Sequence, residues 1–265
     1  MDVKQLYKDA VGSVVVVETE DGSGTGFVAR GDGLVLTNHH VVTPCEAVTV
    51  RYSDGTSCEG KVVSSDRNAD LAGVFPLAPW ARERSPLLFG EAADAEVGDW
   101  VMAIGHPGDA AEFSMTHGHV SAVNTKGCSI DGLLQLNMSA NWGMSGGPVL
   151  CEKGRVVGVT TRIVFTRGNT VRVEGLCGAV PLNMVLPFVG TIPALTEDVL
   201  AQRQYCAVCG CLSHPGTYCE RCGAAFRKAS ATAAPPPIGA HTCAICGISF
   251  EESGEKYCRN CGTKR

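Results

Sequence analysis

A serine set among glycines, in Gly143-Met144-Ser145-Gly146-Gly147, is the segment best suited to covalent chemistry. A serine hydroxyl is a weak nucleophile until a base takes its proton and N–H groups stabilise the oxyanion that forms. Glycines on both sides of Ser145 allow a tight turn that aims the N–H groups of Gly143 and Ser145 at one point. Taken alone, the pattern is equally consistent with a turn that has no catalytic role.

Two histidines and two aspartates are candidates for the base and acid that such a serine needs. His39 and His40 end a predicted strand, where a short helical turn presents an imidazole. We expect His40 to be the base and His39 to be a bystander. Asp70 opens a buried segment and is predicted to hold the imidazole in its working tautomer, with Asp66 as the alternative. The predicted triad is His40, Asp70 and Ser145.

Short apolar segments separated by glycine and Asp-Gly turns indicate β-strands. Six are predicted before a Pro-rich connector at Pro76–Glu96: Ser13–Glu18, Thr25–Arg30, Leu34–Asn38, Ala47–Tyr52, Cys58–Ser64 and Leu71–Phe75. Six are predicted after it: Trp100–Ile104, His119–Asn124, Leu133–Asn137, Pro148–Leu150, Val156–Thr161 and Leu176–Val180. The sequence therefore predicts an all-β fold with two barrels.

Five motifs follow one another along this region: Gly24-Thr25-Gly26-Phe27, Thr37-Asn38-His39-His40-Val41, Asp70-Leu71-Ala72, Ala103-Ile104-Gly105-His106-Pro107 and Gly143-Met144-Ser145-Gly146-Gly147-Pro148. Together they resemble HtrA-like trypsin-fold serine proteases over residues 10–190. The resemblance implies two perpendicular six-stranded barrels with the triad in the cleft between them. It also implies that Gly143 and Ser145 supply the oxyanion-hole N–H groups.

The chain departs from this family pattern near the nucleophile. Met144 stands where the family usually has Asn, Trp142 where it has Pro, and Asn137 where an Asp is common. The segment after residue 205 is too short for a PDZ-like module. On the resemblance, Ser139 floors the specificity pocket. Because Ser139 is uncharged, a small or medium apolar P1 side chain is expected.

Four C-x-x-C pairs, each followed by glycine, occupy the last part of the chain. Two such pairs bring four thiolates onto one ion, the closed tetrahedral arrangement typical of structural zinc. Disulfides and iron–sulfur ligation are the alternatives. The pairs resemble double zinc ribbons and predict two structural zinc ions and no cofactor for catalysis. The predicted ligands are Cys206, Cys209, Cys219 and Cys222 for the first ion, and Cys243, Cys246, Cys258 and Cys261 for the second.

The other cysteines and the histidines near the pairs are not predicted to be ligands. Those beside the pairs are Cys211, His214 and His241. Those in strand-like context, expected to be buried thiols, are Cys45, Cys58, Cys128, Cys151 and Cys177.

The predicted domain organisation follows the change in composition near residue 200. It comprises a protease domain (1–196), a linker with a short helix capped by Thr196 (197–205), a first zinc ribbon (206–227), a Pro/Ala-rich linker (228–240) and a second ribbon (241–265). The spacer with three consecutive prolines is not expected to pack.

Charge and composition limit the range of partners. The net charge is −5, and zinc-bound thiolates would bring the basic tail back to about neutral, which argues against nucleic acid. The uncharged run Gly175–Thr196 is interrupted by three prolines and suits a membrane helix poorly. The N-terminus carries no apolar leader, and thiol pairs of metal-binding type favour a reducing compartment, so a cytoplasmic location is expected.

The leading functional hypothesis is an endopeptidase that acts on proteins or peptides. Its ribbons would serve targeting or assembly through a protein partner, and a homo-oligomer is compatible with this interpretation. One alternative is a catalytically silent trypsin-fold protein that only binds peptides. The other is a zinc-ribbon adaptor that binds nucleic acid or protein.

Overall fold

The computed structural model describes residues 2–43, 45–108, 113–125, 130–161, 166–167, 171–172, 175–206 and 208–226.

Strands rich in β-branched residues close the first barrel. The barrel strands are β1 (Val14–Thr19), β2 (Gly22–Val28), β3 (Val35–Thr37), β4 (Ala47–Tyr52), β5 (Ser57–Asp66) and β6 (Leu71–Pro76). They pair antiparallel in the order β1-β2-β3-β6-β5-β4. Four consecutive valines of β1 are fully buried, because the closed barrel covers one face and the rest of the molecule the other.

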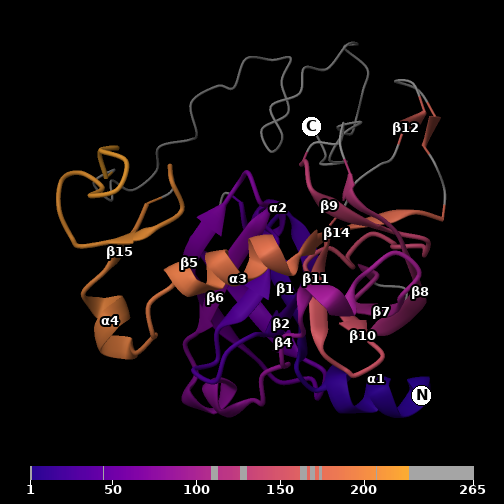
Figure 1. Ribbon diagram of the computed structural model, residues 1–265. Coiled ribbons are helices and arrows are strands. Elements are labelled where there is room, and N and C mark those ends of the chain that lie inside the picture. Colours follow the sequence, from indigo (N-terminus) through magenta and orange to yellow (C-terminus); the bar gives the residue numbers. More distant parts are fainter. Residues whose placement is uncertain are drawn as a thin grey trace, which may run out of the picture.

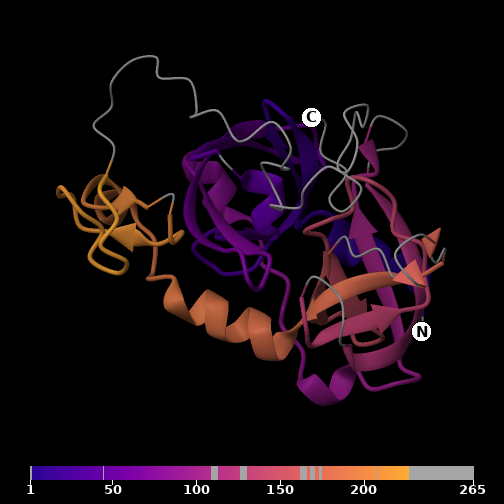
Figure 2. The ribbon, with the colours of Figure 1, turned by 90° about the horizontal axis from the view of Figure 1, so that it is seen from above.

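The second barrel also has six strands, and the predicted fold class is therefore confirmed. They are β7 (Trp100–Gly105), β8 (Ser114–Thr125), β9 (Leu133–Leu136), β10 (Pro148–Cys151), β11 (Val156–Thr161) and β14 (Cys177–Pro181), in the order β10-β11-β14-β9-β8-β7. The two barrels lie side by side (Figures 1 and 2). One hydrophobic cluster contains Phe27 and Leu36 from the first barrel and Met102 and Ile104 from the second, so the barrels share a core.

Helices and short strands complete the described part of the chain. The α-helices are α1 (Val3–Val11), α2 (His39–Val42), α3 (Leu182–Thr191) and α4 (Glu197–Ala201), and the connector holds the 3-10 helices η1 (Pro79–Glu83) and η2 (Ala92–Asp94). Two-stranded pairs are formed by β12 (Thr166–Arg167) with β13 (Val171–Arg172) and by β15 (Gln204–Tyr205) with β16 (Leu212–Ser213). None of the described helices combines the length and apolar character needed to span a membrane.

Three elements differ from the prediction. Strand β8 begins at Ser114 instead of His119, because pairing with β7 recruits the polar segment before it. Helix α1 was not predicted; Asp2 caps it, and the hydroxyl of Tyr7 donates to the carbonyl of Phe113 in the second barrel. Helix α3, which follows β14 in the uncharged run, was not predicted either.

Helix α3 carries the chain from the second barrel back across the first (Figures 1 and 2). It buries Leu182, Val185 and Phe188 in the shared core. The predicted short helix beyond it is confirmed as α4, where the Thr196 hydroxyl accepts from the N–H of Val199 at 3.2 Å. The linker at 228–240 and the second ribbon at 241–265 lie outside the described residues.

Candidate active site

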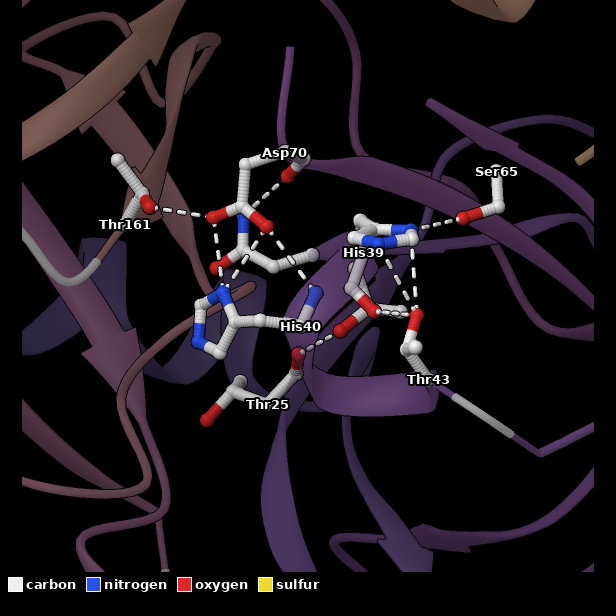
Figure 3. Close-up of polar contacts among 9 residues, drawn as sticks. Thr25, His39, His40, Thr43, Ser65, Asp70 and Thr161 are labelled. Atoms are coloured by element: carbon white, nitrogen blue, oxygen red, sulfur yellow. Dashed lines mark hydrogen bonds and ion pairs between the residues drawn. The ribbon is translucent and has the colours of Figure 1, made fainter. Parts of the chain in front are cut away.

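His40 and Asp70 meet at the edge of the first barrel that faces the second (Figure 3). His40 lies in α2, directly after β3. Its Nδ1 is 2.8 Å from Oδ2 and 2.9 Å from Oδ1 of Asp70, and its backbone N–H donates to Oδ1 at 3.1 Å. The side chain of His40 is 25% exposed and that of Asp70 only 11%. The carboxylate thus fixes the orientation of the ring from its buried side, while the imidazole remains partly exposed.

The backbone at Asp70 adopts an unusual conformation that turns the chain from β5 into β6. Its φ is +52°, in the left-handed region that few residues other than glycine adopt. The buried amide of Asn38 donates to the carbonyl of Asp70 at 2.8 Å. Asn38 is also the residue that precedes α2, so one side chain couples the acid to the helix that carries the base.

Thr161, the last residue of β11 in the second barrel, donates a hydrogen bond of 2.6 Å to Oδ2 of Asp70 (Figure 3). Burial raises the pKa of Asp70, but the charge of His40 and the hydrogen bonds from His40 and Thr161 outweigh it, so the pKa is lowered overall. Asp70 is therefore held ionised. Thr161 was not predicted as a site residue. The only signal in the sequence was a polar residue at the end of an apolar strand.

The alternative residues, His39 and Asp66, point elsewhere. Nδ1 of His39 lies 2.5 Å from the hydroxyl of Ser65, and its ring also contacts Thr43 (Figure 3). Burial lowers the pKa of His39. Asp66 accepts from the N–H groups of the two residues Asn68 and Ala69, at 2.8 and 3.2 Å, and closes a local turn. The structure thus brings Asp70, and not Asp66, to His40.

Ser145 lies on a loop of the second barrel that packs against the first. The N–H of Thr25 in β2 donates to the carbonyl of Ser145 at 2.8 Å. Gly24 is enclosed between α2 and this loop: a Cβ there would lie 2.6 Å from Val41 Cγ2 and 3.2 Å from the carbonyl oxygen of Ser145. Gly24 therefore lies between the loop that carries Ser145 and the helix that carries His40.

The turn before Ser145 requires glycine at position 143. Gly143 has a φ of +87°, and a Cβ there would lie 2.0 Å from the carbonyl oxygen of His106. Among the described residues, the N–H groups of Gly143 and Ser145 donate to no backbone carbonyl, whereas that of Met144 donates to Asn141. An oxyanion hole requires N–H donors that are available to the developing charge, and Gly143 and Ser145 supply two such groups.

The three positions that depart from the family pattern have distinct environments. Met144 is buried in the core of the second barrel and anchors the loop. Trp142 beside it is 56% exposed. The Oδ1 atom of Asn137 accepts from the N–H of His119 at 2.6 Å and fixes the start of the segment. Ser139, the predicted pocket residue, is exposed on the same segment.

The first predicted zinc site is assembled in the described part of the chain. The Sγ atoms of Cys206, Cys209, Cys219 and Cys222 all lie within 4.8 Å of one another. Two of the pairs are 3.7 and 3.6 Å apart. Four thiolates around zinc at about 2.3 Å would be about 3.8 Å apart, so the four residues fit this ion. The second predicted set lies outside the described residues.

A fifth thiol lies closer to this cluster than expected. The Sγ of Cys211 is 3.3 Å from that of Cys209 and 3.6 Å from that of Cys219. His214 is directed to the carboxylate of Glu220 at 3.0 Å, away from the sulfurs. Elsewhere, Cys151 and Cys177 are buried free thiols, and Cys45 and Cys58 are half-buried; Cys128 and His241 are outside the described residues.

The segment predicted as the first ribbon is docked on the first barrel, beside α3 (Figure 2). The N–H of Ser65 in β5 donates to the carbonyl of Gly210 at 2.7 Å. A Cβ on Gly210 would lie 1.9 Å from the carbonyl oxygen of Ser65, so only glycine permits this approach. The same Ser65 contacts His39 through its hydroxyl, so a single residue joins the ribbon to the helix of the candidate base.

Comparisons with known proteins agree with this architecture. The sequence profile of the trypsin-like peptidase domain matches residues 24–159. A probable periplasmic serine endoprotease, DegP-like, from Rickettsia conorii is 31% identical over 66% of this chain and 38% of its own length. A protein of the same description from Brucella suis is 37% identical over 60% of this chain and 30% of its own. The chain thus spans about a third of the length of these relatives.

Two solved structures share the fold. The HtrA-type protease AlgW with tripeptide superposes with a TM-score of 0.63 at 23% identity, over 72% of this chain and 63% of that one. The serine endoprotease from Yersinia pestis gives a TM-score of 0.60 at 26% identity, over 72% of this chain and 66% of that one.

The expected cytoplasmic location is wrong. The relatives are named periplasmic endoproteases, and thiol pairs that fit a metal do not identify a reducing compartment, because metal-bound thiolates are not free to pair as disulfides.

The matched profile covers more than half of the chain, and the two barrels agree with it. The chain therefore belongs to the trypsin-like peptidase family.

Proposed function

We propose that this chain is a serine endopeptidase of HtrA type that cleaves proteins or peptides through an acyl-enzyme on Ser145. The observation that carries the proposal is the meeting of His40, Asp70 and Thr161 at the junction of the barrels, with Ser145 on the adjoining loop. The relatives named as serine endoproteases support the same activity.

In the proposed reaction, His40 takes the proton of Ser145 as the hydroxyl oxygen attacks the scissile carbonyl. The buried carboxylate of Asp70 accepts a hydrogen bond from Nδ1–H of His40, which leaves Nε2 as the basic nitrogen and stabilises the imidazolium. That imidazolium then gives its proton to the leaving amine. In the second half of the reaction, the deacylation, His40 takes a proton from water as the water oxygen attacks the acyl-enzyme ester. The ester bond to Ser145 then breaks, and the proton passes from His40 to the Ser145 oxygen.

The oxyanion that forms in each half would be bound by the N–H groups of Gly143 and Ser145. Both are free of backbone partners within the described residues, so neither must break a bond to meet the charge. Preorganised donors of this kind contribute about 3–4 kcal/mol each to lowering the barrier.

Digestion of fluorescein-labelled casein by the full-length chain tests this function. We expect wild type to release fluorescent peptides and Ser145→Ala and His40→Ala to release none while keeping their circular dichroism spectra. A wild-type chain that binds casein without cutting it would support the silent peptide-binding alternative instead.

The proposal extends to substrate preference through Ser139. An uncharged residue at the pocket floor provides no counter-charge for a basic or acidic P1 side chain, so small or medium apolar P1 residues are favoured. Sequencing of casein fragments gives the preference directly. Ser139→Asp is expected to shift cleavage toward Lys and Arg, and an unchanged fragment pattern would exclude Ser139 from the pocket.

We also propose that each ribbon holds one structural zinc ion and serves targeting or assembly. The donor chemistry of four clustered thiols supports zinc at Cys206, Cys209, Cys219 and Cys222, where the ion would fix the fold of a segment too short to bury its own core. Metal analysis of the full-length chain is expected to give two zinc ions, falling to one in Cys206→Ser. Iron, or an unchanged zinc content in that variant, would contradict the assignment.

A further inference from the structure

Thr25, a fully buried residue of β2, uses all of its polar atoms at the junction of the two barrels. Its hydroxyl donates to the carbonyl of Gly143 at 2.6 Å and accepts from the N–H of His106 at 2.9 Å. Its N–H donates to the carbonyl of Ser145 at 2.8 Å, and its carbonyl accepts from the hydroxyl of Thr37 at 2.6 Å. Figure 3 shows Thr25 next to His40.

These contacts fix two carbonyls that are two residues apart. The Gly143 carbonyl belongs to the peptide before Met144, and the Ser145 carbonyl to the peptide after the nucleophile. Because each peptide unit is planar, holding its oxygen also sets the direction of its N–H. With both neighbouring peptides held by one residue, the orientation of the intervening Ser145 N–H is restricted.

The second barrel also holds the loop. The N–H of Gly146 and the carbonyl of Gly147 bond to the backbone of β11, each at 2.8 Å, and the buried side chain of Met144 packs in the core of that barrel. Neither contact is made to the Gly143 carbonyl or the Ser145 carbonyl. On the side of the first barrel, Thr25 bonds to both of these carbonyls.

We propose that Thr25 is a positioning residue that holds the Gly143–Ser145 turn in the conformation that binds the oxyanion. The inference rests on the proposed function, since it assigns Thr25 a role in the same acyl transfer. Thr25 contacts neither substrate nor proton in this role. It acts through the Gly143 and Ser145 carbonyls, so its loss should slow acylation without weakening substrate binding.

The test compares acylation of the full-length wild type, Thr25→Val and Thr25→Ser by p-nitrophenyl acetate. Valine keeps the shape but removes the hydroxyl, and we expect acylation about 10–100-fold slower, as for a misplaced reacting group. The KM should change by no more than about twofold, because the N–H groups of the turn stabilise the oxyanion of the transition state and not the bound substrate. Serine keeps the hydroxyl, and Thr25→Ser should acylate within about threefold of wild type.

Thr160→Val is the matched control. Thr160 is also a buried threonine, but its hydroxyl has no hydrogen-bond partner among the described residues, so this variant should acylate at the wild-type rate. Should valine at position 25 disturb folding, Thr25→Ala removes the hydroxyl without adding atoms and should show the same slow acylation.

Two results would overturn the proposal: a folded Thr25→Val or Thr25→Ala that acylates like wild type, or a Thr25→Ser that is as slow as Thr25→Val. The second would assign the effect to packing of the methyl group. Both differ from failure of the proposed function, in which the wild type itself would not be acylated at Ser145.

Discussion

The hydroxyl of Thr161 on β11 and the carboxylate of Asp70 before β6 form a hydrogen bond of 2.6 Å between the two barrels. The bond is assisted by the charge of the carboxylate and is buried, which makes it stronger than a typical neutral hydrogen bond. The acid that orients His40 therefore depends on the second barrel for part of its environment. Catalytic geometry and barrel packing are coupled at this residue pair.

Thr161→Val should lower both stability and activity. The variant keeps the shape of the side chain but leaves a buried carboxylate without one of its donors, so the free energy of unfolding at pH 7 should fall by about 1–3 kcal/mol. The pKa of Asp70 should rise, because the hydrogen bond from Thr161 helps to lower it. Urea unfolding of Thr161→Val beside Thr160→Val measures the stability effect. Equal losses in the two variants would mean that the bond to Asp70 contributes nothing.

The free energy of unfolding should decrease at low pH, and part of this decrease should come from Asp70. Its pKa is lower in the folded chain than in the unfolded one, where it is about 3.9. The ionised form therefore stabilises the fold above about pH 4, and this contribution is lost as the pH falls through the folded value. Asp70→Asn should flatten the decrease of unfolding free energy below about pH 4. A variant whose acid dependence matches that of wild type would contradict the lowered pKa.

The two neighbouring histidines should differ in function. His40→Ala should abolish casein cleavage, whereas His39→Ala should retain most of it, because the His39 ring is engaged by Ser65 and Thr43 and not by Asp70. Activity of the two variants, both checked for folding, measures the difference. The assignment of the base is wrong if His39→Ala is as inactive as His40→Ala.

Docking of the first ribbon should depend on Gly210. Gly210→Ala would bring a Cβ to 1.9 Å from the carbonyl oxygen of Ser65, so the ribbon should separate from β5 and the segment 196–205 should become sensitive to trypsin. Gly223→Ala is the control, because Gly223 has a similar positive φ of +71° but no atom within 4 Å of its Cβ position. We expect both variants to keep two zinc ions. Equal trypsin sensitivity would show that backbone strain, and not contact with Ser65, decides docking.

Removal of zinc should unfold the tail and spare the barrels. The barrels have their own shared core, while the proposed ribbon would depend on its metal for folding. A chelator is therefore expected to abolish the thermal transition of the tail and to leave that of the barrels within about 4 °C. Loss of casein cleavage on chelation would show instead that the docked ribbon orders the active site through Ser65 and His39.

Local sequence signals predicted the elements formed by local interactions. The valine-rich segments and Asp-Gly turns identified all twelve barrel strands. The place of Asp70 at the start of a buried segment favoured it over Asp66, and Asp70 is the residue that contacts His40. Thr25 and Thr161 could not be found in this way. Their partners lie 118 and 91 residues away, so only the packing of one barrel against the other brings them together.

Helices α1 and α3 were missed for a related reason. The uncharged run that becomes α3 includes Pro187 and gives no amphipathic pattern, and its helical form is stabilised by burial of Val185 and Phe188 in the shared core. Cys211 lies beside the C-x-x-C pairs and was not predicted to be a ligand. Its approach to Cys209 follows from the tight turn at Gly210.

In the proposed function, Ser145 is a nucleophile activated by His40. Mass-spectrometric mapping of the full-length chain after reaction with a fluorophosphonate detects this activation at the residue itself. We expect a single modified peptide that contains Ser145, present in wild type and His39→Ala and absent in Ser145→Ala and His40→Ala. A wild-type chain that stays unmodified, or one modified at another serine such as Ser139, would contradict it.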